Sequence, residues 1–117
     1  MKNIIEELTN QIIDFRDKRE WKQFHNAKDL AISLNIEAAE LLECFQWKSL
    51  DEVKELINSE EVIKVQEEIA DVAIYLMLLC NELNIDLEDA IIDKLDKNDK
   101  KYPVSKSKGN AQKYDQL

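Results

Sequence analysis

Two pairs of acidic residues, each spaced for one face of a helix, are the residues of this chain best suited to chemistry. Glu37 and Glu40 form the first pair, and Glu68 and Asp71 form the second. Residues three apart share a helix face, so each pair directs two carboxylates the same way. Both pairs lie in mostly apolar stretches, where a carboxylate needs a compensating charge. The spacing therefore predicts that four carboxylates bind a hard cation such as Mg²⁺, which would favour a phosphorylated substrate.

The elements that position these carboxylates are predicted to be long helices. One Gly and one Pro in 117 residues leave few sharp turns, which favours an all-α fold. Asn26, Ser49 and Asp86 are predicted helix N-caps. Apolar periodicity predicts helices over about residues 3–18, 27–47, 50–57, 60–83 and 87–101. We expect one helical domain over residues 1–103 and a basic C-terminal tail over residues 104–117.

The stretch from Ile69 to Cys80 is apolar almost all round, so it should be buried on several sides. A chain this small can hardly cover such a helix alone, and packing against a second copy is expected. The stretch is too short to span a bilayer, and the N-terminus lacks a secretory signal. Cys44 and Cys80 both lie in apolar helical stretches, so we expect a cytoplasmic protein with free thiols and no membrane contact.

The net charge of −9 is unevenly distributed. Residues 1–93 carry 9 basic and 22 acidic residues, whereas residues 94–117 carry 7 Lys and 3 Asp. The acidic body would repel a long nucleic-acid duplex, so duplex binding is not expected. Lys94, Asn98 and Lys101 lie on one face of the predicted helix 87–101, where they form either a solvated face or a phosphate contact.

Several other site chemistries are disfavoured by the residues present. A di-iron carboxylate bundle needs Glu-x-x-His motifs, and the only histidine, His25, belongs to none. No glycine-rich phosphate loop exists, because Gly109 is the only glycine. Trp21, Trp47 and Tyr75 are either core residues or aromatic surfaces for a nucleobase. An oligomeric interaction module with a structural cation stays open as an alternative to an enzyme.

Three runs of the chain resemble the dCTP pyrophosphatase branch of the MazG-like superfamily. They cover residues 21–48, 67–76 and 90–114, and they combine F-H, F-Q-W-K and K-x-x-x-N-x-x-x-Y-P with the two acidic pairs. The resemblance implies a four-helix bundle-like MazG fold assembled as a homo-oligomer, usually a tetramer with a dimer possible, whose sites form where subunits meet. It also implies Mg²⁺-dependent hydrolysis of a nucleoside triphosphate to the monophosphate and pyrophosphate, a housekeeping reaction of the nucleotide pool.

The same resemblance assigns roles to individual residues. Lys94 would stabilise charge on the leaving pyrophosphate. Ile12 stands where the animal dCTP enzyme has a pocket histidine, so the resemblance leaves open which base this chain prefers. We expect dCTP or a related pyrimidine deoxynucleotide as the substrate. The related phosphoribosyl-ATP pyrophosphohydrolase is the competing enzyme, against which F-H and F-Q-W-K argue. The implied metal ligands, which with Lys94 are also the catalytic residues, are Glu37, Glu40, Glu68 and Asp71. The implied nucleotide-binding residues are Trp21, His25, Trp47, Tyr75, Lys94, Asn98, Lys101 and Tyr102.

Overall fold

A computed structural model describes residues 3–117, and over that range the chain forms helices and no strand. The chain divides after Asn84 into two compact units, which are described separately. The predicted all-α class is confirmed. The helices are α1 (Ile4–Lys18), the 3-10 helix η1 (Trp21–Phe24), α2 (Ala27–Glu43), α3 (Leu50–Leu56), α4 (Glu61–Glu82), α5 (Leu87–Lys101), α6 (Val104–Ser107) and the 3-10 helix η2 (Tyr114–Gln116).

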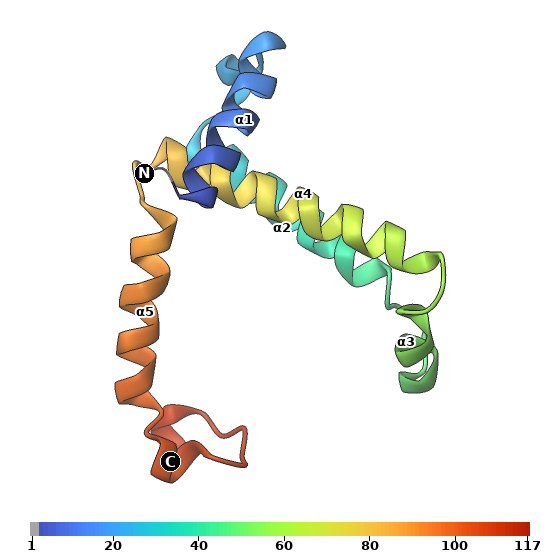
Figure 1. Cartoon of the computed structure of the whole chain (residues 1–117), viewed down its shortest axis with the longest axis vertical. Coiled ribbons are helices and arrows are strands. Elements are labelled where there is room, and N and C mark those ends of the chain that lie inside the picture. The colour runs from blue at the N-terminus through green and yellow to red at the C-terminus, as the bar shows by residue number, and fades with distance from the viewer. Residues whose placement is uncertain (1–2) are drawn as a thin grey trace. The chain divides into compact units, whose positions relative to one another are not determined.

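The first unit is built on α2 and α4, which lie side by side and antiparallel (Figure 1). Helix α1 packs against α4, and η1 lies against α1. The apolar side chains buried between these helices include Leu30 of α2 and Val65 and Leu78 of α4. Because α2 and α4 run in opposite directions, acidic residues midway along one helix face acidic residues midway along the other.

Side-chain caps that the sequence predicts fix where α2, α3 and α5 begin. The Asn26 side chain accepts a hydrogen bond from the backbone N–H of Asp29 at 2.9 Å, as predicted for the start of α2. Ser49 begins α3 with a complete capping box, and Asp86 caps α5. Each cap satisfies backbone N–H groups that have no partner within the helix. These N-caps confirm the sequence predictions.

Helix α2 ends at Glu43, so the predicted continuation to residue 47 is wrong. Phe45 donates its backbone N–H to the carbonyl of Leu42, three residues back, and the chain proceeds through turns. Trp47 has a φ of +68°, in the left-handed region, which a right-handed helix cannot contain. The indole of Trp47 therefore lies beyond the helix, and the residue is 91% exposed.

Helix α5 in the second unit has the bounds predicted from the sequence. The predicted tail over residues 104–117 contains the short helices α6 and η2. Tyr114 of η2 meets Tyr102 edge-to-face, with 6.1 Å between ring centroids. The ammonium group of Lys101 lies 4.9 Å from the centroid of the Tyr114 ring. The segment after Pro103 is thus held against the end of α5, and a domain boundary at residue 103 stays a prediction.

A single chain leaves much apolar surface of the first unit uncovered. Leu78 is buried, but Ile69 on the same helix is 52% exposed, and Ile32 and Ile36 of α2 are also exposed. The predicted burial of residues 69–80 on several sides is therefore not reached within one chain. None of the helices in residues 3–117 is long and apolar enough to cross a membrane.

Candidate metal and nucleotide site

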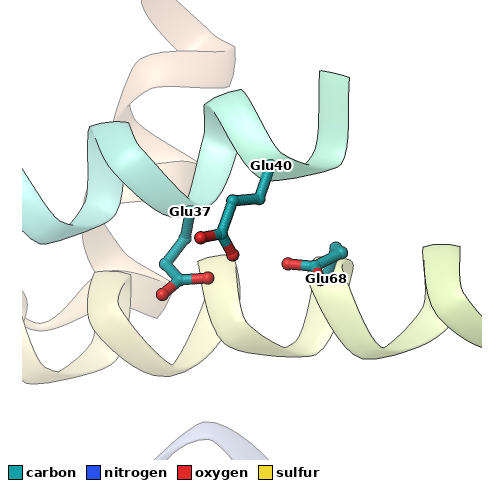
Figure 2. A group of neighbouring side chains, drawn as sticks. All are labelled: Glu37, Glu40 and Glu68. Carbon is teal, nitrogen blue, oxygen red and sulfur yellow. The ribbon is translucent and has the colours of Figure 1, made fainter. Parts of the chain in front are cut away.

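Three of the four predicted carboxylates converge between α2 and α4. Glu37 and Glu40 project from α2, and Glu68 projects from α4 toward them (Figure 2). One carboxylate oxygen from each residue lies within 4.8 Å of the other two. The i, i+3 spacing places the first two on one face, and antiparallel packing brings the third opposite. This acidic cluster is defined by Glu37, Glu40 and Glu68.

Glu68 is the most deeply buried member of the acidic cluster, at 3% exposure. Its Oε1 accepts a hydrogen bond from the Nζ of Lys64, one turn earlier on α4, at 2.7 Å. This contact holds the pKa of Glu68 below its usual value and raises the pKa of Lys64. The second oxygen, Oε2 of Glu68, is buried and has no hydrogen-bond partner among the described residues. Lys64 therefore compensates only one side of this carboxylate.

The pKa of Glu37 is shifted in the opposite direction to that of Glu68. Burial raises its pKa, and the neighbouring carboxylates of Glu40, Asp71 and Glu68 raise it further. Its Oε2 is also buried without a partner in the described part of the chain. A buried, unpartnered anionic oxygen is costly. Two such oxygens in an all-carboxylate group fit a hard divalent cation, which accepts oxygen ligands from several carboxylates.

Asp71, the fourth predicted ligand, lies outside the three-oxygen group but shares a cavity with Glu37. This cavity has a volume of about 230 Å³ and is enclosed by residues of α1, η1, α2 and α4. Apolar and aromatic side chains form most of its walls, and its acidic lining residues are Glu37, which belongs to the acidic cluster, and Asp71. The lining residues are Ile12, Phe15, Arg16, Trp21, His25, Glu37, Asp71, Ile74, Tyr75 and Leu78.

The cavity brings together three of the predicted nucleotide-binding residues. Trp21, His25 and Tyr75 line it together with Ile12, the position that opens the base preference. Trp47 does not line it. The remaining predicted contacts lie in the second unit. Lys94 and Lys101 are exposed on α5, whereas Asn98 and Tyr102 are half-buried.

Sequence reasoning did not identify Arg16 as part of this cavity. Arg16 is 5% exposed, and its guanidinium contacts Asp17. The one available signal is its position four residues after Ile12, which places both side chains on one face of α1. Burial of the imidazole lowers the pKa of His25, and the positive charge of Arg16 lowers it further.

A model of the MazG-like family matches residues 32–117. The chain belongs to the MazG-like family. This MazG-like protein is 40% identical to dCTP pyrophosphatase 1 of Mus musculus and 34% identical to that of Homo sapiens. Each match covers 97% of this chain and 67% of the relative. The predicted family and branch are confirmed.

A solved structure of a pyrophosphatase from Archaeoglobus fulgidus is similar in both sequence and fold. It is 45% identical to this MazG-like protein, with a TM-score of 0.80. The match covers 88% of this chain and 95% of that chain. The two proteins are therefore similar in amino-acid sequence as well as in the arrangement of their helices.

Proposed function

We propose that this MazG-like protein hydrolyses a nucleoside triphosphate to the monophosphate and pyrophosphate, with dCTP or a related pyrimidine deoxynucleotide preferred. The observation that carries the proposal is the acidic cluster, with two buried oxygens lacking partners, beside a cavity with aromatic walls. The names of the relatives, dCTP pyrophosphatase and pyrophosphatase, support the same reaction class. The reaction removes nucleotides from the pool as housekeeping.

Mg²⁺ is the proposed cation, held by Glu37, Glu40 and Glu68, with Asp71 as the fourth ligand. Such a cation neutralises phosphate oxygens and lowers the pKa of a bound water. Glu37 or Glu40 is proposed to accept the proton of the attacking water or to orient that water. Lys64 keeps Glu68 oriented through the 2.7 Å contact.

The remaining proposed roles concern the base and the phosphates. Trp21 and Tyr75 offer aromatic surfaces to the base within the cavity, and His25 lies beside them. Lys94 is proposed to stabilise charge on the leaving pyrophosphate. Asn98, Lys101 and Tyr102 are proposed to contact phosphate or sugar. Trp47 is proposed as a further aromatic contact, consistent with its exposed ring.

We further propose that the protein works as a homo-oligomer, a tetramer or a dimer. Ile32 and Ile36 of α2 and Ile69 of α4 present apolar surface that a second copy could cover. Light scattering coupled to gel filtration measures the number of copies. A cytoplasmic location is proposed because Cys44 and Cys80 are free thiols.

Product analysis of a panel of nucleotides, with Mg²⁺ and with EDTA, tests the proposed reaction. We expect monophosphate and pyrophosphate from dCTP in Mg²⁺ and none in EDTA. Glu40→Gln should abolish this turnover, whereas Glu67→Gln, which removes an exposed acid outside the acidic cluster, should retain it. Absence of turnover with every nucleotide would favour an oligomeric interaction module with a structural cation.

Lys94→Met provides a separate test of the phosphate contact. We expect a lower kcat/KM for dCTP while Mg²⁺ still raises the melting temperature, because Lys94 is not a proposed metal ligand. Lys100→Met is the matched control, since Lys100 is exposed on the same helix and pairs with Asp96. An equal loss of activity in both variants would indicate a general effect of charge rather than a specific contact.

A further inference from the structure

The cavity has two chemically different ends along α4. The charges that act on Glu37 are those of the other cluster acids and Asp71. The charges that act on His25 are those of Arg16 and Glu82. Asp71 and Glu82 are eleven residues apart on α4, which is about 16 Å along a helix. Arg16 and Glu82 are thus the charges that act on His25, whereas Asp71 and the cluster acids act on Glu37.

Arg16 has hydrogen-bonding capacity in the cavity that the described residues do not use. Its side chain is 6% exposed; its Nε donates a hydrogen bond to Oδ1 of Asp17 at 2.9 Å, and its Nη2 lies 2.8 Å from the same oxygen in an ion pair. Guanidinium carries five N–H groups, so Asp17 occupies one side of the fork. The Nη1 makes no hydrogen bond within residues 3–117. The Nδ1 of His25 is buried and has no hydrogen-bond partner among the described residues.

Apart from Glu37 and Asp71, the side chains that line the cavity with Arg16 and His25 are apolar or aromatic. Ile12 precedes Arg16 by one helical turn and brings no polar atom, while Trp21 and Tyr75 supply aromatic rings. A planar ring with a polar edge satisfies both features at once, because its faces contact the aromatic side chains and its edge meets the guanidinium. Asp17 holds one side of the fork through its Oδ1.

We propose that Arg16 is a specificity-determining residue that selects pyrimidine bases with two adjacent acceptors, as cytosine has in O2 and N3. This inference rests on the proposed function, because it assigns the base of the nucleotide to the cavity. Two parallel N–H groups of a guanidinium match two adjacent acceptors. Uracil and thymine place an N3–H donor beside O2, so they offer the fork one acceptor and one opposing donor.

Calorimetric titration of dCMP and dUMP in EDTA tests this selection without requiring hydrolysis. The wild-type protein should bind dCMP roughly 5- to 150-fold more tightly than dUMP, the discrimination that a good bidentate contact gives. Arg16→Gln should bring the ratio of the two dissociation constants close to one. Lys18→Gln removes the same charge from an exposed position on α1, where Lys18 pairs with Asp14, and should leave the ratio unchanged.

Arg16→Lys keeps the positive charge but lacks the two parallel N–H groups of guanidinium. The ratio of the dissociation constants for dUMP and dCMP should therefore also fall close to one in this variant. Arg16→Lys provides the test if Arg16→Gln does not fold. An unchanged ratio in Arg16→Lys, an equal weakening of both ligands, or a wild-type protein that does not prefer dCMP would overturn the inference. Selective binding without any hydrolysis of dCTP would refute the proposed function alone. Hydrolysis of dCTP with a ratio unaffected by Arg16 would refute the inference alone.

Discussion

Glu40→Gln should stabilise the metal-free protein while it removes the response to Mg²⁺. One oxygen of Glu40 lies within 4.8 Å of oxygens of Glu37 and Glu68. Two unit charges at that separation repel by about 0.9 kcal/mol in water and by about 3.5 kcal/mol at an effective dielectric constant of 20. Glu40 is exposed, so the lower value applies to each of its two pairs, with Glu37 and with Glu68, and removal of its charge should add about 1 to 2 kcal/mol to the free energy of unfolding.

Thermal unfolding in EDTA and in Mg²⁺ measures both effects. Each gain of about 1 kcal/mol corresponds to roughly 4 °C in melting temperature for a domain of this size. A cation present at about 100 times its dissociation constant should stabilise the wild-type protein by about 2.7 kcal/mol. Glu40→Gln should lose most of that stabilisation, and Glu67→Gln should keep it. A Glu40→Gln variant that is less stable in EDTA, or that keeps the full Mg²⁺ shift, would refute electrostatic repulsion in the cluster.

Three further predictions concern single residues. Burial and the charge of Arg16 lower the pKa of His25, so the unfolded state binds the proton more readily, and stability should fall as the pH drops below about 6.5. His25→Gln should reduce the difference in urea midpoint between about pH 7.5 and 5.5, and an unaltered difference would contradict this. Burial raises the pKa of the Cys80 thiol, so iodoacetamide should modify Cys80 more slowly in the folded protein than in urea, as followed by peptide mass. Ser49→Ala removes the capping box of α3 and should cost about 1 kcal/mol in urea unfolding; an unchanged midpoint would show that the cap contributes nothing.

The parts of the site that could be predicted from the sequence depend on short-range geometry. The i, i+3 spacing of Glu37 and Glu40 fixes a shared face without any knowledge of the fold. The caps at Asn26, Ser49 and Asp86 likewise depend on residues within three positions. Convergence of these acids with Glu68 needed only that two successive long helices pack antiparallel.

The parts that could not be predicted depend on backbone and tertiary geometry that periodicity does not encode. The apolar pattern of α2 continues through Phe45, and no glycine marks the end at Glu43, yet Trp47 adopts a positive φ. Lys94 and Asn98 were placed correctly on α5, but helical periodicity carries no information on how the unit beginning at Ile85 meets a substrate.

Arg16 shows why a sequence reveals an acidic cluster more readily than a buried cation. Glu37 and Glu68 are conspicuous because apolar residues surround them, whereas Arg16 stands among Asp14, Asp17 and Lys18 and looks like part of a solvated face. A long arginine stem can lie against apolar neighbours while its head keeps a polar partner. Whether it does so depends on how closely α1 packs on α4. The proposed base selection by Arg16 therefore depends on a contact between helices, and a substitution in that interface should alter substrate preference while leaving the carboxylates in place.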